Sequence, residues 1–439
     1  MINDDQSPAR LSLIPRNLRR PALQARQDDR LRATLKWASA NSVFWAKRIG
    51  GVDLDAPGIR SKLAEIPFTS KEELLAEQDA EPPFGRIVCV PPSPGSRVFS
   101  TSGTTGNSFL RVFSDSDWRR STASVAESIR RVATAGDLLM LTSPADGLMG
   151  PSLAEAATRR VGAIPISAGK WSTEARVRFI QSAGPSAIAG TTSYLLHLGT
   201  RLREAGGAPR MPRGLMCFGE PGAGVDETVA KFRALFGDEV LIEDGYGLTE
   251  VGPISSGCTL NRELHLREES LLAECVDPLT GEPAPEGVLG ELVFTTLTIE
   301  AQPVIRYRTG DLARVTSTPC ACGSPARRLI NSVEGRADDM IWYRGLNLFP
   351  AAFAAAVVAD ERLSDEFELV VDEGNDLTTL ILRVEIFDVA QDDVVKREVA
   401  DVVRSRIGVD ARVEAVRPGD LQLRTPNGKV RRVRRINTR

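Results

Sequence analysis

The feature that most restricts the fold is a regular alternation of short apolar runs with amphipathic stretches in the middle of the chain. Five apolar runs have the length and composition of buried strands, at residues 138–142, 163–166, 187–189, 215–218 and 240–242. The stretches that follow them carry apolar residues at helical spacing, at residues 152–161, 173–182, 193–204 and 226–236. This alternation predicts an α/β fold with a mostly parallel sheet flanked by helices. Ligands of such sheets bind at the carboxyl ends of the strands.

The pattern differs on either side of this region. Upstream, residues 30–48 have helical spacing, and Ser70 followed by Glu73 is typical of a helix start. Downstream, extended segments predict a β-rich subdomain, at residues 271–276, 290–297 and 311–315. After Arg336 a compact α+β unit is expected, with helices at 350–358 and 393–407 and strands at 368–371, 379–386 and 411–416. We therefore predict a large N-terminal domain, residues 1–337, joined by a hinge to a small C-terminal domain, residues 338–439.

Composition excludes several classes of protein. Apolar residues make up 42% of the 439 residues and charged residues 26%, which is the balance of a soluble globular protein. The net charge of −3 does not indicate a nucleic-acid partner, and no apolar run reaches the ~18 residues of a membrane span. Six cysteines in a chain of this length do not suggest a disulfide framework, which favours the reducing cytosol. Only two histidines are present, so a histidine-dependent nucleophile mechanism is disfavoured.

A glycine-, serine- and threonine-rich loop at residues 99–107 has the composition of a phosphate-binding loop. Gly103 and Gly106 allow close approach of the backbone to a ligand, and the N–H groups and hydroxyls between them offer donors to an anion. The loop is not a Walker loop, because Asn107 and Ser108 stand where Lys and Ser/Thr are required. The alternative is an ordinary polar surface loop.

Four further residues could complete a nucleotide site. Tyr246 lies between two glycines, where its ring could stack on adenine, and Glu250 offers hard carboxylate oxygens to Mg²⁺. Asp311 follows Gly310 in a turn and could accept hydrogen bonds from ribose hydroxyls. Near the end of the chain, Lys429 lies on a turn from which it could neutralise charge on a transferring phosphorus centre. The alternative for each residue is a solvated turn.

Eight segments, taken in this order, resemble a known superfamily. They are residues 66–71 (IPFTSK), 102–106 (SGTTG), 219–221 (GEP), 246–250 (YGLTE), 305–311 (IRYRTGD), 335–339 (GRADD), 344–350 (RGLNLFP) and 428–429 (GK). The set resembles the adenylate-forming superfamily of acyl-CoA synthetases, luciferases and peptide-synthetase adenylation domains. The phenylacetate-CoA ligase-like branch is the most similar, and the resemblance spans about residues 30–435.

The resemblance implies a two-step reaction with ATP, Mg²⁺ and coenzyme A. A small carboxylic acid first forms an acyl-adenylate with release of pyrophosphate, and a thiol then displaces AMP. Catalytic roles are implied for Thr249, for Glu250 as the Mg²⁺ ligand and for Lys429, which contacts the α-phosphate during adenylation only. Asp338 is implied as the hinge of the terminal domain. The implied nucleotide contacts are Thr101, Ser102, Gly103, Thr104, Thr105, Gly106, Glu220, Pro221, Asp244, Tyr246, Gly247, Asp311 and Arg336.

Four residues form a candidate metal set: Cys258, His265, Cys320 and Cys322. Three thiolates and one imidazole suit a closed, tetrahedral zinc site without an open position for chemistry. The alternative is a group of unrelated thiols in a reduced protein. Some members of the resembled branch carry similarly placed residues that bind zinc, so the resemblance implies a structural Zn²⁺.

The acid pocket is expected at four loops, residues 143–149, 166–171, 191–194 and 219–221. If Asp146 faces this pocket, its carboxylate favours a substrate with an amino or hydroxyl group; otherwise it is a surface turn residue. Trp171 and Tyr194 could stack on an aromatic ring, and Gly219 contributes to the fourth loop. We therefore expect an aromatic or heteroaromatic acid.

Two other functions are compatible with the sequence. An acyl-AMP ligase could pass its acid to the pantetheine thiol of an acyl carrier protein or to a nitrogen nucleophile. A regulatory nucleotide-binding protein without turnover is a different class, against which Lys429, Glu250 and Asp311 argue. The basic cluster at residues 431–435 suits a coenzyme A phosphate, an acidic carrier protein or simply a solvated tail. We expect a cytoplasmic enzyme without nucleic-acid or membrane partners, and a homodimer is compatible with the sequence.

Overall fold

The computed structural model describes residues 19–101, 108–258, 260–337, 339, 341–343, 346–348, 350–358, 360, 362–372, 379–388, 392–421, 423 and 432–436. The chain forms two compact units. The first comprises Met1–Val225, Val229–Thr309 and Ala313–Val333, and the second comprises Asp226–Thr228, Gly310–Leu312 and Glu334–Arg439. Among the described residues, no helix combines the length and the apolar character that crossing a membrane requires.

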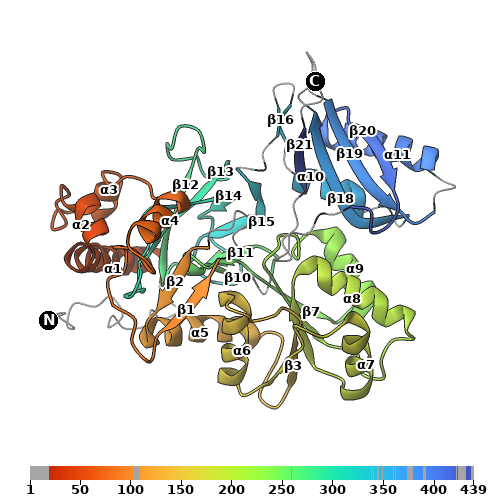
Figure 1. Ribbon diagram of the computed structural model, residues 1–439, viewed down its shortest axis with the longest axis horizontal. Helices are drawn as coiled ribbons and strands as arrows, with labels where there is room; N and C mark the ends of the chain where they lie inside the picture. The colour runs from red at the N-terminus through yellow and green to blue at the C-terminus, as the bar shows by residue number, and fades with distance from the viewer. Residues whose placement is uncertain are drawn as a thin grey trace. The chain divides into compact units, whose positions relative to one another are not determined.

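The predicted parallel sheet is present in the first unit, with strand order β4-β3-β5-β6-β7. Two of its strands, β3 and β7, are labelled in Figure 1. Its strands are β3 (Leu138–Leu141), β4 (Ile164–Ser167), β5 (Ala187–Gly190), β6 (Gly214–Phe218) and β7 (Leu241–Gly245). The surrounding helices are α5 (Asp115–Ile129), α6 (Met149–Val161), α7 (Thr173–Ala183), α8 (Thr192–Glu204) and α9 (Asp226–Phe236). Successive strand residues face opposite cores: Ile188 packs in the cluster that contains α7 and α8, and Ala189 in the cluster that contains α5 and α6. The α/β prediction is confirmed.

The β-rich subdomain is a six-stranded sheet with order β10-β11-β15-β14-β13-β12. Its strands are β10 (Ser255–Gly257), β11 (Leu264–Leu266), β12 (Leu271–Val276), β13 (Leu289–Thr296), β14 (Tyr307–Thr316) and β15 (Arg328–Arg336). Two short antiparallel pairs lie elsewhere in the unit, β1 (Arg97–Ser100) with β2 (Leu110–Phe113) and β8 (Gly247–Leu248) with β9 (Gly252–Pro253). The three predicted extended segments correspond to β12, β13 and β14, and β10 and β11 are additional.

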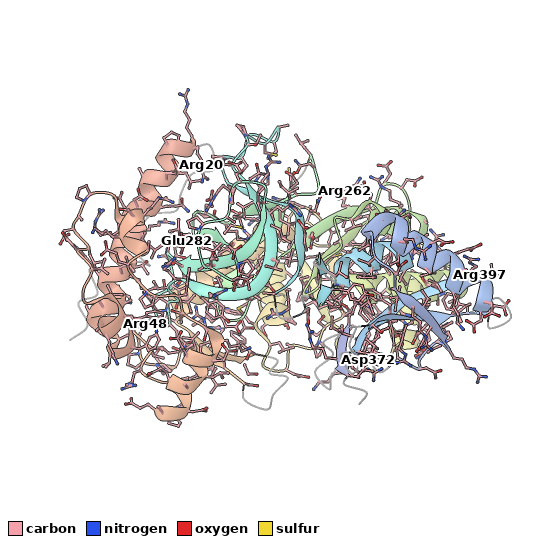
Figure 2. The ribbon with its side chains drawn as sticks, turned by 90° about the horizontal axis from the view of Figure 1, so that it is seen from above. Arg20, Arg48, Arg262, Glu282, Asp372 and Arg397 are labelled. Atoms are coloured by element: carbon pink, nitrogen blue, oxygen red, sulfur yellow. The ribbon has the colours of Figure 1, made fainter. Side chains whose placement is uncertain are left out.

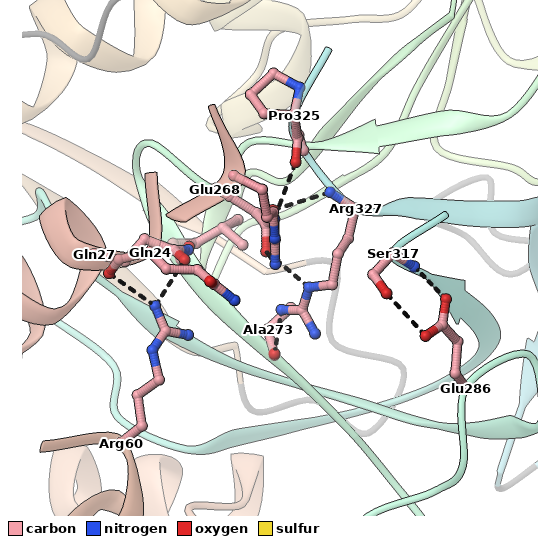
Figure 3. A network of polar contacts seen from close by, with 12 residues as sticks. Gln24, Gln27, Arg60, Glu268, Ala273, Glu286, Ser317, Pro325 and Arg327 are labelled. Atoms are coloured by element: carbon pink, nitrogen blue, oxygen red, sulfur yellow. Dashed lines mark hydrogen bonds and ion pairs between the residues drawn. The ribbon is translucent and has the colours of Figure 1, made fainter. Parts of the chain in front are cut away.

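The N-terminal helices pack on this subdomain. They are α1 (Arg20–Asn41), α2 (Val43–Ile49), α3 (Ile59–Leu63) and α4 (Lys71–Ala80), and the predicted start of α4 is confirmed by reciprocal bonds between Ser70 and Glu73. The helix predicted over residues 30–48 is instead broken at Ser42, whose extended backbone ends α1 and whose hydroxyl caps α2. Arg20, labelled in Figure 2, pairs with Glu268, which also accepts a 2.8 Å hydrogen bond from Arg327 (Figure 3).

The second unit contains the predicted α+β fold. A four-stranded sheet has order β20-β19-β18-β21, with bounds β18 (Leu363–Asp372), β19 (Thr379–Ile386), β20 (Arg412–Val416) and β21 (Val433–Ile436). Helices α10 (Pro350–Val358) and α11 (Asp392–Ile407) pack on it, and β16 (Ile341–Tyr343) pairs with β17 (Leu346–Leu348). Strand β21 runs parallel to β18, and Arg434 pairs with Glu368 at 2.9 Å. Within the basic cluster at residues 431–435, Val433, Arg434 and Arg435 therefore belong to an edge strand of this sheet, in which both arginines are exposed.

Candidate nucleotide and metal sites

The glycine-rich loop is the connection between two antiparallel strands. Strands β1 and β2 pair with Ser100 opposite Leu110. Thr101 is buried at the base of the loop, where its N–H donates to the Phe109 carbonyl at 2.9 Å and its Oγ1 accepts from the Phe109 N–H at 3.0 Å. The predicted contacts Ser102, Gly103, Thr104, Thr105 and Gly106 lie outside the described residues.

The candidate adenine residues lie at the carboxyl end of β7 and directly after it. The Tyr246 carbonyl accepts hydrogen bonds from the N–H groups of Ile254 and Ser255 at 2.9 and 3.0 Å, and the Tyr246 ring lies 6.4 Å from that of Phe294. Asp244 is buried, and its Oδ2 has no hydrogen-bond partner among the described residues. Burial and the neighbouring charge of Glu243 raise the pKa of Asp244 to about 7. A buried carboxylate oxygen without a partner is a candidate ligand contact.

Glu250, the candidate Mg²⁺ ligand, lies directly after the β8 turn beside Thr249. It is buried, and its Oε1 lies 3.1 Å from the ammonium group of Lys71 at the start of α4. Lys71 is placed there because Thr69, two residues earlier, pairs with the start of strand β14. The Thr69 N–H donates to the Arg306 carbonyl, and the Thr69 carbonyl accepts from the Arg308 N–H, both at 2.9 Å. Residues 66–71 could be recognised as a motif from the sequence, but no role was predicted for Lys71.

The candidate ribose residues contact each other in the second unit. Arg336 Nη1 lies 2.9 Å from Asp311 Oδ1, and Asp311 is buried. Gly310 and Asp311 lie within strand β14 and not in the predicted turn. Gly310 has φ +73°, a conformation that residues with a Cβ rarely adopt, so this position favours glycine. Asp338 and Lys429 lie outside the described residues.

The loops after β5 and β6 meet at Glu220. Its Oε2 accepts a 3.0 Å hydrogen bond from the Ser193 N–H at the start of α8. Gly219 has φ +81°, which lets the chain turn sharply out of β6 before Glu220 and Pro221. Ser193 Oγ is buried without a partner among the described residues. These positions form the sheet edge at which the sequence predicts ligand binding.

Tyr194 lies against helix α7. Its hydroxyl is 3.2 Å from Thr173 Oγ1, and the Arg176 guanidinium lies 4.7 Å from the centre of its ring. Arg176 is itself buried and donates to the carbonyls of Thr142 and Ala168 at 2.8 Å. Arg176 therefore braces the loops after β3 and β4, a role that sequence reasoning did not identify.

Two other candidate pocket residues lie near the surface. Asp146 is exposed and lies 3.2 Å from Lys170 Nζ, so its carboxylate has a partner other than substrate. Trp171 is 38% exposed and packs edge-on against Phe179 at 5.3 Å, in a shallow groove on α7. Neither placement supports a buried contact with the acid.

The four predicted metal ligands converge in the first unit. One ligand atom from each of Cys258, His265, Cys320 and Cys322 lies within 4.8 Å of all the others. Cys258 Sγ lies 3.6 Å from Cys320 Sγ, and Cys322 Sγ lies 3.2 Å from His265 Nε2. Cys258 directly follows β10 and His265 lies in β11, whereas the other two lie in the turn after β14. The donor types and their convergence fit a tetrahedral Zn²⁺.

Comparison with known proteins identifies relatives over nearly the whole chain. Residues 26–299 match the AMP-binding enzyme family, and residues 345–436 match the AMP-binding enzyme C-terminal domain. The chain is 32% identical over 444 residues to a phenylacetate-coenzyme A ligase of Thermus thermophilus, covering 95% of this chain and 97% of the relative. It is also 32% identical over 375 residues to the Escherichia coli phenylacetate-coenzyme A ligase, covering 83% of this chain and 82% of that relative.

Solved structures of similar proteins also include acid–coenzyme A ligases. A 2-hydroxyisobutyryl-CoA ligase in complex with 2-HIB-AMP matches with a TM-score of 0.85 at 27% identity, covering 100% of this chain and 93% of that chain. The same ligase in complex with 2-HIB-AMP and CoA matches with a TM-score of 0.69 at 28% identity, covering 95% and 90%. The chain therefore belongs to the AMP-binding enzyme family and, within it, to the phenylacetate-coenzyme A ligase-like branch of adenylate-forming acid–coenzyme A ligases.

Proposed function

We propose that this acid–coenzyme A ligase activates an aromatic carboxylic acid with ATP and transfers the acyl group to coenzyme A. The observation that carries the proposal is the match, over 95% of the chain, to a relative named phenylacetate-coenzyme A ligase. Asp244 Oδ2 is buried at the carboxyl end of β7 and has no hydrogen-bond partner in the part of the chain that the structure describes, which supports a ligand at this edge of the sheet.

The two steps follow from the groups available. A carboxylate oxygen of the acid attacks the α-phosphorus of ATP, and the bond to pyrophosphate breaks. The thiolate of coenzyme A then attacks the acyl carbon, and AMP leaves. We assign the 101–106 loop to the β- and γ-phosphates, Asp244, Tyr246 and Gly247 to adenine, and Asp311 with Arg336 to ribose.

In this proposal, catalysis depends mainly on positive charge close to the phosphates of ATP. When bound, Mg²⁺ would neutralise phosphate charge, and Glu250 is the carboxylate that would hold it, beside Thr249. Lys71 Nζ lies 3.1 Å from Glu250 Oε1 and is the counter-charge of this carboxylate. We assign Lys429 to the α-phosphate during adenylation, and Asp338 to the hinge that moves residues 338–439 between the half-reactions.

The identity of the acid has two candidates. The named relatives favour an arylacetic acid, although Trp171 packs edge-on against Phe179 and the Arg176 guanidinium lies over the Tyr194 ring. A small 2-hydroxy acid is the second candidate, because 2-hydroxyisobutyryl-CoA ligase matches over the whole chain. For the acceptor, coenzyme A is favoured over a carrier-protein thiol or a nitrogen nucleophile by both groups of relatives.

The test is acid-dependent release of pyrophosphate from ATP across a panel of arylacetic, benzoic and small hydroxy acids, followed by mass spectrometry of the product made with coenzyme A. The proposal expects the highest kcat/KM for an arylacetic acid and a coenzyme A thioester as product. A preference for hydroxy acids would select the second candidate. ATP binding without pyrophosphate release for any acid would instead favour a regulatory protein.

We further propose that Cys258, His265, Cys320 and Cys322 bind one structural Zn²⁺. Purified protein should contain about one zinc per chain, and Cys320→Ser should lower the zinc affinity by at least about 100-fold, since loss of an outer-shell partner alone costs 10–100-fold. Thermal stability should fall while kcat at a permissive temperature changes little. Metal analysis and calorimetry check this, with Cys89→Ser, a buried thiol outside the cluster, as control. A stable, metal-free preparation would contradict the proposal.

A further inference from the structure

The metal cluster and the nucleotide strand meet at Gly257. This residue ends β10 and immediately precedes Cys258, and its N–H donates to Glu243 Oε1 at 3.2 Å. A Cβ at position 257 would lie 3.1 Å from Glu243 Oε2 and 3.4 Å from the Asp244 nitrogen. The backbone beside the first cluster thiol is thus in direct contact with the end of β7, which leads to Asp244 and Tyr246.

Arg131, from a third segment of the chain, contacts the same two strands, β7 and β10. Its Nη1 lies 2.9 Å from Glu243 Oε2 and also donates to the Gly257 carbonyl. The Glu243 side chain is only 3% exposed, so Arg131 is the counter-charge of a buried carboxylate. Arg267 contributes a weaker positive charge, so removing Arg131 takes away the main counter-charge of Glu243, and the local arrangement then has to change. Arg131 follows α5, so three separate segments meet at this point.

A bound metal would restrain one side of this contact. Strands β10 and β11 pair with Ser256 opposite His265 and Gly257 opposite Leu264, so Cys258 and His265 lie on the two arms of one hairpin. Cys320 and Cys322 come from the turn after β14. A metal held by all four residues would fix the hairpin, and with it Gly257, against that turn.

We propose that Arg131, Glu243 and Gly257 form a positioning link through which metal at the Cys/His cluster raises the affinity of the enzyme for ATP. The link acts by holding the end of β7, and therefore Asp244 and Tyr246, in the arrangement that binds the nucleotide. By thermodynamic linkage, ATP raises the affinity for the metal by the same factor. This inference rests on the proposed zinc site and on the proposed adenine contacts.

The test measures ATP binding to the full-length protein by titration calorimetry, with Mg²⁺ and without acid, in zinc-loaded and zinc-depleted samples. In the wild type we expect zinc removal to weaken ATP binding by about 10-fold, within the roughly 5- to 150-fold range that is typical of coupling between two binding sites. Arg131→Gln should weaken ATP binding by a similar factor and abolish the response to zinc. In turnover assays it should raise the KM for ATP while leaving kcat and the KM for the acid unchanged.

Two variants control for non-specific damage. Arg130→Gln makes the same substitution at an exposed neighbour and should behave as the wild type, and Arg131→Lys should restore part of the response to zinc. An equal effect of zinc in the wild type and in Arg131→Gln would overturn the proposal, as would unchanged ATP affinity after zinc removal. If Arg131→Gln does not fold, the link is tested in the wild type by measuring its zinc affinity with and without ATP. Equal zinc affinities would refute the link. Absence of any metal binding would also refute it, while pyrophosphate release would still test the proposed function separately.

Discussion

Replacing Lys429 by alanine is expected to slow acid-dependent pyrophosphate release by about 100- to 1,000-fold, the usual cost of removing one preorganised donor from a charged transition state. Negative charge accumulates around the α-phosphorus as the carboxylate attacks, and an ammonium group there lowers the barrier. Formation of the thioester from a supplied acyl-adenylate should stay within about 3-fold of the wild type, because no phosphorus centre reacts in that step. Rapid-quench assays of the two half-reactions separate these effects.

Lys396→Ala is the matched control for Lys429→Ala. Lys396 lies on α11 of the same terminal unit, where it pairs with Asp392 at 2.6 Å and is partly exposed. Its loss should leave both half-reactions unchanged. If Lys429→Ala slowed both half-reactions equally, the residue would be supporting the fold or the acceptor site, and its assignment to adenylation would be wrong.

The parallel sheet could be predicted because its strands are short apolar runs without helical periodicity. Residues 187–189, for example, are followed by an amphipathic segment that can only cover the sheet. The hairpins β10–β11 and β16–β17 could not be predicted, since strands of three residues are too short to show alternation. The break between α1 and α2 was missed because Ser42 interrupts an apolar pattern that continues on both sides of it.

In the candidate site, too, the local sequence predicts some features and does not reveal others. Asp244 and Tyr246 follow a recognisable strand, so their position at the sheet edge could be predicted from local sequence. The pairing of Lys71 with Glu250 depends on a bridge between Thr69 and Tyr307, which are far apart in the chain, and no local pattern reveals it. Asp146 shows the opposite case, because the local sequence is compatible with both a pocket residue and a surface turn residue. The structure has Asp146 exposed and paired with Lys170, which corresponds to the second alternative.

The second large effect is expected for Glu250→Gln, which should lower the rate of adenylation by about 100-fold, or about 2.7 kcal/mol. Glutamine keeps the size of the buried side chain but removes the charge that would hold Mg²⁺. The same change leaves Lys71, now 3.1 Å from a neutral amide, without its counter-charge. The Mg²⁺ concentration for half-maximal rate should therefore rise, and thermal unfolding should show whether the fold is retained.

Two control variants test whether the effect is specific to the carboxylate of Glu250. Glu239→Gln, at an exposed position just before β7, removes a carboxylate without touching the site and should leave the Mg²⁺ dependence unchanged. Lys71→Met combined with Glu250→Gln removes both charges, so it should recover any stability lost through the unpaired ammonium but none of the lost rate. A Glu250→Gln enzyme that is slow yet has the Mg²⁺ dependence of the wild type would show that Glu250 serves Lys71 and the fold of the loop, and the metal ligand would have to be sought elsewhere.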